Sequence, residues 1–158
     1  MVEMTRILDG WQGDQPASVL DVGAFDVNGC YRNMVERRGW TYVGLDLQGG
    51  LNVDVVSREP YMWPIHDGQY DIVISGSTLE HVEMPWKWMP EAARVLRPGG
   101  LLAVITHTQL ALHRFPVDCW RVMPDGMTVL FDLCGNLRDY DIRMYCTTDI
   151  SGVAYKCS

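Results

Sequence analysis

Short apolar runs alternate along this chain with longer windows of helical composition. The first run is residues 18–22, Ser-Val-Leu-Asp-Val, which follows the turn-like segment 13–16. Its apolar, β-branched composition predicts a buried strand. Residues 31–38 have helical composition, and Gly39 suits the end of that helix because glycine adopts the left-handed backbone of a C-terminal cap. The chain is therefore predicted to begin its fold with a strand followed by a helix.

The same alternation continues to the end of the sequence. Further strands are predicted at 41–46, 52–56, 71–75 and 101–105, with two more near 140–145 and 150–155. Residues 71–75 are apolar on both faces, which is typical of a central parallel strand. A helix is predicted from Pro85 to Leu96, stopped by Pro98-Gly99-Gly100, and Asp125 is expected to cap a last helix through Leu133. Strands that alternate with helices indicate a mostly parallel sheet covered on both faces.

The size and composition of the chain fit one compact domain. It has 158 residues, of which 47% are hydrophobic and 21% charged, and this balance can fill one core. No apolar run approaches the roughly 18 residues that a membrane helix needs, and the first six residues lack a signal-peptide pattern. We therefore expect residues 1–158 to form a single cytoplasmic domain without a membrane partner.

Charge and cysteine content narrow the classes of function. The formal net charge is -7 and the longest basic run is Arg37-Arg38, which argues against a nucleic-acid substrate because phosphate binding needs a basic face. The five cysteines are odd in number, widely spaced and without a C-x-x-C pair, so neither a disulfide framework nor a cysteine zinc site is indicated.

Polar and small residues stand where the predicted strands end. In an open parallel sheet, ligands bind beyond the carboxyl ends of the strands, where the strand order reverses. Gly23 and Ala24 follow the first strand, where a small backbone lets a ligand approach closely. Asp46 ends the second strand, and a carboxylate there can accept both ribose hydroxyls of an adenosine. Asp54 on the third strand is predicted to meet the adenine edge.

This pattern alone leaves more than one cofactor open. An acidic residue at the end of the second strand also serves NAD dehydrogenases. The G-x-G-x-x-G pattern is absent, however, because only Gly23 and Gly29 are present in the first loop, and without more glycines a pyrophosphate lacks its amide cradle. A G-x-x-x-x-G-K-[ST] segment is also absent, which argues against a P-loop nucleotidase.

Two segments in the second half resemble class I S-adenosylmethionine-dependent methyltransferases. Residues 69–82, Gln-Tyr-Asp-Ile-Val-Ile-Ser-Gly-Ser-Thr-Leu-Glu-His-Val, resemble the fourth-strand motif of that family, and residues 90–102 resemble the helix, turn and strand that follow it. The resemblance covers roughly 18–135. The first loop, Asp26-Val27-Asn28-Gly29, and residues 113–121 resemble a bacterial and phage subgroup whose members often sit near surface-glycan genes.

The resemblance implies a fold and a cofactor. The fold is an α/β, Rossmann-like three-layer sandwich whose mostly parallel sheet has an antiparallel last strand. S-adenosylmethionine is the expected cofactor and S-adenosylhomocysteine the product. In such enzymes the methionine end of the cofactor lies over the loop of Asp21 and Gly23, Asp46 holds the ribose, and the backbone of 75–77 borders the sulfonium. The expected cofactor-binding residues are Asp21, Gly23, Ala24, Asp46, Leu47, Asp54, Val55, Ser75 and Gly76. Phe25 and Val27 replace two family glycines.

Methyl transfer from a sulfonium is a direct displacement, so the protein mainly aligns the acceptor, the methyl group and the sulfur. A general base is needed only where the acceptor loses a proton, as a sugar hydroxyl would. The expected catalytic residues are His113, Asp118 and His81, and the expected acceptor-binding residues are His107, His113, Asp118 and Arg121. Structural roles stay open, since His81 can hold a loop and Asp118 can pair with Arg121. We expect no metal site.

The acceptor and the partners are less defined than the cofactor. A small-molecule or glycan acceptor is expected, and a homo-oligomer or a partner subunit is left open. Two alternatives to a methyltransferase remain open. One is a non-catalytic S-adenosylmethionine-binding or partner-regulating module, and the other is a NAD-type dinucleotide enzyme. The second would be favoured by a catalytic Tyr-x-x-x-Lys, which the sequence lacks.

Overall fold

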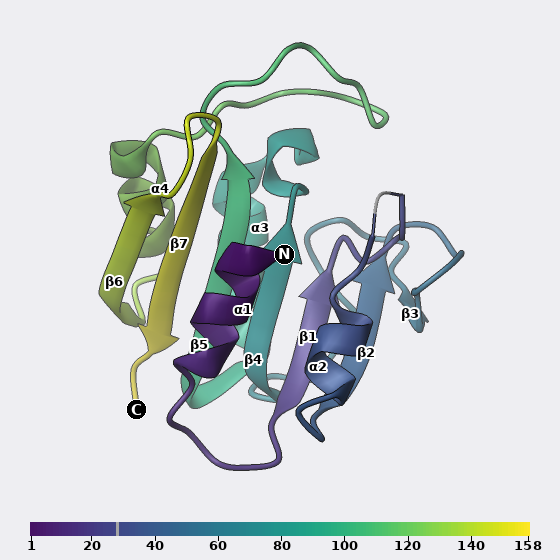
Figure 1. Ribbon diagram of the computed structural model, residues 1–158, viewed down its shortest axis with the longest axis vertical. Coiled ribbons are helices and arrows are strands. Elements are labelled where there is room, and N and C mark those ends of the chain that lie inside the picture. Colours follow the sequence, from purple (N-terminus) through teal and green to yellow (C-terminus); the bar gives the residue numbers. More distant parts are fainter. Residues whose placement is uncertain (28) are drawn as a thin grey trace.

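A computed structural model of the chain describes residues 1–27 and 29–158; Asn28 of the first-loop motif lies outside the described residues. In the described part, seven strands form one sheet in the order β3-β2-β1-β4-β5-β7-β6 (Figure 1). The strands are β1 Ser18–Val22, β2 Thr41–Asp46, β3 Val55–Val56, β4 Tyr70–Gly76, β5 Leu96–His107, β6 Leu137–Met144 and β7 Asp149–Lys156. Strands β1 to β5 pair in parallel, and β7 runs antiparallel to both of its neighbours.

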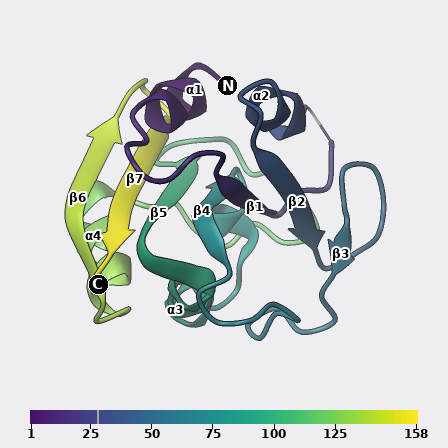
Figure 2. The same cartoon turned by 90° about the horizontal axis from the view of Figure 1, so that it is seen from below.

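Helices cover both faces of this sheet and give the predicted three-layer sandwich. Figure 2 shows α1 and α2 on one face and α3 and α4 on the other. The helices are α1 Val2–Asp9, α2 Arg32–Glu36, α3 Pro85–Val95 and α4 Pro124–Asp132, with a 3-10 turn, η1, at Leu79–His81. Because a parallel sheet is apolar on both faces, each face needs such a cover to exclude water.

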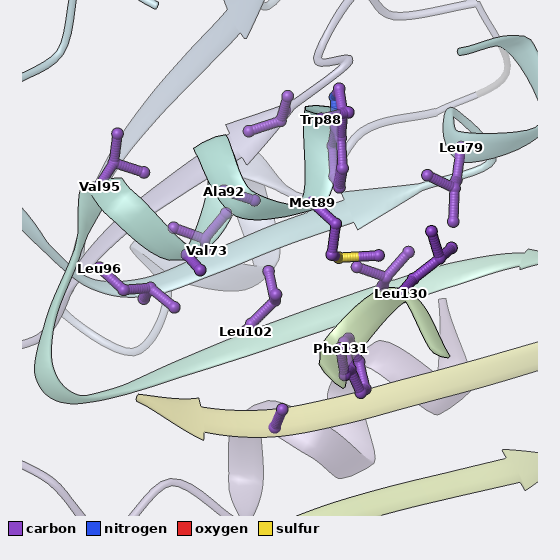
Figure 3. Close-up of a cluster of buried hydrophobic side chains, with 14 of the residues drawn as sticks. Val73, Leu79, Trp88, Met89, Ala92, Val95, Leu96, Leu102, Leu130 and Phe131 are labelled. Atoms are coloured by element: carbon purple, nitrogen blue, oxygen red, sulfur yellow. The ribbon is translucent and has the colours of Figure 1, made fainter. Parts of the chain in front are cut away.

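Alternate residues of the central strands pack into two separate cores. Ile72 and Ile74 of β4 face α1 and α2, where the core also contains Met4 and Leu8. Val73, between those two isoleucines, points to the other face and packs with the buried side chains of α3, α4 and β5, as Figure 3 shows. The two-residue period of a strand thus divides one apolar run between two cores.

The main strands lie where the sequence predicts them, and the differences have local causes. Strands β1 and β2 have the predicted bounds. Strand β3 is confined to Val55–Val56 because Asn52 has a left-handed backbone, with φ of 71°, and its side chain donates to Tyr42 and Ala24 instead of facing outward from a strand. The predicted start of this strand at 52 is therefore wrong.

Two helix ends also differ from the expectation. Strand β5 begins at Leu96, directly after α3, so Pro98-Gly99-Gly100 lies inside that strand beside a register irregularity of the β4 pairing instead of forming a separate turn. Pro124 occupies the first turn of α4 and Met123 its N-cap, so Asp125 is not the cap.

Helix α1 was not predicted, although Met4, Ile7 and Leu8 are buried with helical spacing.

In the described part of the chain, no helix is both long enough and apolar enough to span a bilayer.

Candidate functional site

The carboxyl ends of β1, β2, β4 and β5 meet at one edge of the sheet (Figure 1). Strand β1 lies between β2 and β4, and the chain leaves β1 toward α2 on one face but leaves β4 toward α3 on the other. The strand order therefore reverses between β1 and β4. Because the two connections diverge, this edge is where an α/β sheet of this kind binds its ligand.

The backbone after β1 is held tightly at this edge. The amides of Gly23 and Ala24 both donate to the carbonyl of Leu45, over 2.9 and 3.1 Å. Gly23 has φ of +81°, and a Cβ at this position would lie 2.1 Å from Thr78 Oγ1. Only glycine fits both the left-handed backbone and this contact. The loop consequently lies between the end of β2 and the segment that follows β4.

Asp46 presents its carboxylate beside that loop at the end of β2. Its Oδ2 accepts a hydrogen bond from the amide of Phe25 over 3.1 Å, and its Oδ1 accepts one from Gln48 over 3.3 Å. Leu47 is 56% exposed next to it. The ring of Phe25 packs against Gly50, where a Cβ would lie 2.1 Å from its Cε2. Each Asp46 oxygen keeps a further lone pair for a ligand.

Asp54 is engaged within the protein. Its Oδ2 accepts hydrogen bonds from the amide of Gly44 over 2.8 Å and from Arg32 Nη2 over 2.6 Å, and its own amide donates to Gly44. This places Asp54 level with Gly44, short of the carboxyl end of β2. Val55 follows it and pairs with Leu45. Oδ2 of Asp54 thus joins β2, β3 and α2.

Asp21 is a buried carboxylic acid directly below the first loop. It is 3% exposed, and Tyr42 donates its hydroxyl to Asp21 Oδ2 over 2.5 Å, while Asn52 donates to the same tyrosine oxygen. Burial raises the pKa of Asp21 to about 7, against the opposing effect of the Tyr42 hydrogen bond and with a further increase from the charge of Asp46. This acid therefore changes charge near neutral pH.

Ser75 and Gly76 end β4 at the same edge of the sheet. Ser75 is buried, and its hydroxyl donates to the carbonyl of Val22 over 2.7 Å, so this side chain ties β4 to β1. A Cβ at Gly76 would lie 2.2 Å from the hydroxyl oxygen of Tyr31. Burial raises the pKa of Tyr31 to about 12, so its hydroxyl keeps its proton. The sequence offered no periodic signal that would have placed Tyr31 at this site.

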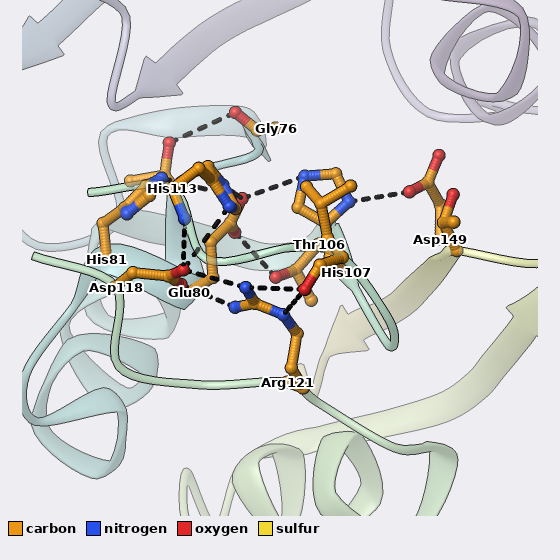
Figure 4. A network of polar contacts seen from close by, with 12 residues as sticks. Gly76, Glu80, His81, Thr106, His107, His113, Asp118, Arg121 and Asp149 are labelled. Carbon is orange, nitrogen blue, oxygen red and sulfur yellow. Dashed lines mark hydrogen bonds and ion pairs between the residues drawn. The ribbon is translucent and has the colours of Figure 1, made fainter. Parts of the chain in front are cut away.

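A group of histidines surrounds one carboxylate beyond β4 and β5 (Figure 4). Glu80 is fully buried, and its Oε2 accepts a hydrogen bond from Thr106 over 2.7 Å. Its Oε1 lies 3.1 Å from Nε2 of His107 and 3.9 Å from Nε2 of both His81 and His113. We call Glu80, His81, His107 and His113 the histidine cluster. It combines residues that are up to 33 positions apart.

The other ring nitrogen of each histidine faces an oxygen atom. The pairs are His81 Nδ1 with the carbonyl of Val117 at 2.5 Å, His107 Nδ1 with Asp149 Oδ1 at 2.7 Å, and His113 Nδ1 with the carbonyl of Ala111 at 3.0 Å. Each imidazole ring is thus held in orientation from its outer side. Asp149, at the start of β7, was not among the predicted site residues.

The loop after β5 is fixed by an ion pair. Arg121 contacts both oxygens of Asp118, over 2.6 and 2.8 Å, and also donates to the carbonyl of Leu110. Asp118 accepts a further hydrogen bond from the amide of His113 over 2.8 Å, and its side chain is 1% exposed. The bonds from Arg121 hold the pKa of Asp118 well below its usual range. The pairing left open by the sequence is present, and it positions His113, whose side chain is 37% exposed.

The structure therefore divides the predicted site residues into groups. One group lies at the carboxyl ends of β1, β2 and β4 and consists of Asp21, Gly23, Ala24, Asp46, Leu47, Ser75 and Gly76. Asp54 and Val55 lie beside β2, at the β2–β3 pairing. His81, His107, His113, Asp118 and Arg121 come together around Glu80, as Figure 4 shows. The role of each residue stays a prediction, since position alone does not assign one.

Comparison with known proteins gives a family and relatives. The profile of a family described as "Methyltransferase domain" matches residues 20–104, which is more than half of the chain. An uncharacterized methyltransferase of Mycobacterium sp. (strain KMS) is 34% identical over 116 residues, covering 65% of this chain and 45% of that protein. The chain thus spans less than half the length of this curated relative.

Two solved structures illustrate the similarity of fold. One is the Burkholderia thailandensis 1,6-didemethyltoxoflavin-N1-methyltransferase with bound 1,6-didemethyltoxoflavin and S-adenosylhomocysteine, at a TM-score of 0.75 and 16% identity, covering 99% of this chain and 77% of that one. The other is a Haloferax volcanii methyltransferase in complex with the Trm112 activator, at a TM-score of 0.69 and 15% identity, covering 98% and 89%. At these identities the comparison shows the fold.

The raised pKa of Asp21 predicts a pH-dependent stability. Because the folded protein favours the protonated acid, ionisation of Asp21 destabilises the fold progressively as pH rises from about 4, its unfolded pKa, through about 7. In urea titrations, the free energy of unfolding of Asp21→Asn should therefore rise relative to that of the wild type as pH increases from about 4 to about 7. Above pH 7 the difference between the two proteins should stay constant. The exposed Asp125→Asn is the control. A difference between Asp21→Asn and the wild type that does not change with pH would contradict this prediction.

Proposed function

Because this chain belongs to the methyltransferase domain family, we propose that it transfers a methyl group from S-adenosylmethionine to a small-molecule or glycan acceptor by direct displacement. One observation carries the proposal: the carboxylate of Asp46 lies beside the left-handed turn at Gly23, at the reversal of strand order. A carboxylate that can accept hydrogen bonds from ribose thus lies next to the backbone of Gly23, which has no side chain, at the place where sheets of this kind bind nucleosides. Residues 1–158 would act as one domain.

The residues at this edge fit the parts of an adenosyl amino acid. Asp46 would accept the ribose hydroxyls with its remaining lone pairs, and exposed Leu47 would cover the adenine. The backbone of Gly23 and Ala24 leaves no side chain larger than a methyl group beside the methionine end. Asp21, once ionised, would attract the ammonium group of the cofactor. Gly76 and the backbone of Ser75 would border the sulfonium.

Asp54 receives a different role from the one that the sequence predicts. One oxygen of its carboxylate, Oδ2, accepts hydrogen bonds from the amide of Gly44 and from Arg32. We propose that Asp54 positions β3 and α2, and that Val55, paired with Leu45, supports the adenine side of the site. Both hydrogen bonds go to Oδ2, so Oδ1 is the oxygen that could still meet a ligand.

The histidine cluster supports an acceptor site beside Gly76. The bound cofactor supplies an activated methyl group, and the chain aligns the acceptor with it and receives a proton where the acceptor is a hydroxyl. His113 is the most exposed histidine of the cluster, so it is the proposed proton acceptor. Asp118 and Arg121 position His113 through its amide. His81 and His107 would line the same site, which suits a hydroxylated acceptor such as a glycan.

The cofactor assignment predicts the effect of removing Asp46. Asp46→Ala should weaken the binding of S-adenosylhomocysteine about 10–100-fold in calorimetry, since it loses charge-assisted hydrogen bonds to the ribose and each ~1.4 kcal/mol is tenfold. Asp14→Ala is a matched control, because Asp14 precedes β1 at the opposite edge and is 86% exposed. Unchanged affinity in folded Asp46→Ala would exclude the ribose contact.

The acceptor assignment predicts a separate set of losses. His113→Ala and Asp118→Asn should reduce turnover while keeping S-adenosylhomocysteine affinity within about threefold, because contacts of the transition state are lost and those of the cofactor are kept. Turnover is measured as S-adenosylhomocysteine release with a panel of glycans and small hydroxylated molecules. Exposed His66→Ala is the control. Full turnover in both variants, or an equal collapse of cofactor binding and melting temperature, would refute the assignment.

A further inference from the structure

The buried carboxylate of Glu80 has one oxygen without a hydrogen bond. Thr106 donates to Oε2, but Oε1 accepts no hydrogen bond from any described residue. The side chain is fully buried, so water does not compensate from bulk solvent. An unpaired anionic oxygen in such a place is costly, because burial of charge is tolerated only with a partner of opposite charge. Glu80 Oε1 therefore needs a cation.

In their neutral form, the surrounding histidines do not donate a hydrogen bond to Glu80 Oε1. Nδ1 of His81 and Nδ1 of His113 each face a backbone carbonyl, and Nδ1 of His107 faces the carboxylate of Asp149. These oxygens can only accept, so each Nδ1 carries the hydrogen. In a neutral imidazole, Nε2 then presents a lone pair. Three Nε2 atoms with lone pairs consequently lie 3.1 to 3.9 Å from one carboxylate oxygen.

We propose that Glu80, His81 and His113 bind a divalent transition-metal ion, with Zn²⁺ as the best match to one carboxylate and two imidazole ligands. One ligand atom from each of these three residues lies within 4.8 Å of the others. Around a single zinc at ~2.0–2.2 Å, ligand atoms are separated by roughly 3.3–3.5 Å, so a closure of about 1 Å would complete the site. His107 Nε2, already 3.1 Å from Glu80 Oε1, is the nearest further nitrogen donor.

The supporting contacts resemble those that metal ligands require. A metal-bound histidine usually donates its second ring N–H to a carbonyl or carboxylate, which fixes the tautomer, and all three histidines of the cluster do so here. Thr106 orients Glu80 in the same way. The nearby charge of Arg121 is already paired with Asp118. His113 is 37% exposed and lies in a loop, so an ion can enter on its side.

This inference reverses the expectation of a site without metal. Three of the four histidines in the chain belong to the cluster, but their positions at 81, 107 and 113 form no recognisable ligand spacing. Only the fold brings them together. Metal binding does not rest on the proposed function. If both hold, the ion would lie beside the acceptor site as a Lewis acid, and His113 would serve as its ligand in place of a proton acceptor.

The test uses the whole chain, treated with a chelator and then equilibrated with ZnCl₂. We expect one zinc per chain after desalting, and at least about 10–100-fold weaker binding in His113→Ala, since loss of even a supporting partner costs that much. His66→Ala controls for the histidine outside the cluster, and Cys119→Ser for the exposed thiol next to Asp118. Both controls should bind zinc like the wild type. No retained zinc, or equal binding by His113→Ala and His66→Ala, would overturn the proposal.

Glu80→Gln separates a metal site from an ion pair with a protonated histidine. Glutamine has nearly the same shape as glutamate, and its amide can donate to the Nε2 lone pairs of the histidine cluster. The melting temperature of metal-free Glu80→Gln should therefore be no lower than that of the metal-free wild type. Zinc should raise the melting temperature of the wild type alone. A lower melting temperature in metal-free Glu80→Gln, without a zinc effect on the wild type, contradicts the site. A wild-type chain that binds S-adenosylhomocysteine but retains no zinc overturns this inference only. A wild-type chain that retains zinc but does not bind S-adenosylhomocysteine overturns only the cofactor assignment.

Discussion

The arrangement of the whole sheet follows from the pairing of β1 with β4. Three residue pairs, from Val19 with Ile72 to Asp21 with Ile74, fix these strands side by side, and the bond from Ser75 to the carbonyl of Val22 secures their carboxyl ends. Because the chain leaves the two strands toward opposite faces, their connections separate above the sheet. The proposed contacts with the cofactor lie at this edge, near the place where the connections separate. The first loop can approach the β4 side only because Gly23 leaves room for Thr78.

Much of the fold could be predicted from local sequence. The strand bounds that could not be predicted depend on tertiary contacts. Strands such as β1 and β2 are short apolar runs bounded by turn residues, so their ends could be predicted. The shortening of β3 could not, because it results from Asn52 reaching across to Tyr42, ten positions earlier. Helix α1 carried a helical spacing of buried residues that a search of the first residues would have found. The start of β5 at Leu96 reflects its pairing with Tyr70, which no helix-stop rule describes.

The candidate site was partly predictable for the same reasons. Strand-end residues such as Asp46 and Gly23 could be located because parallel strands bring their carboxyl ends to one edge. The hydrogen bonds of Asp54 to Gly44 and Arg32 could not be predicted, because they depend on the register of β3. The convergence of His81, His107 and His113 on Glu80 was invisible, since it requires η1, the end of β5 and the following loop to fold together. The loop itself is held by Asp118 and Arg121, a pair that helix-like spacing did suggest.

We propose that S-adenosylmethionine binds at one edge of the sheet, at the ends of β1, β2 and β4. Backbone amide NMR spectra of the isotope-labelled chain, titrated with S-adenosylhomocysteine, test this location. We expect the largest shifts in residues 23–26, 46–48 and 75–78, with little change at the opposite edge around 13–17 and 97–100. Saturable binding whose largest shifts lie at that opposite edge, or in β6 and β7, would contradict it.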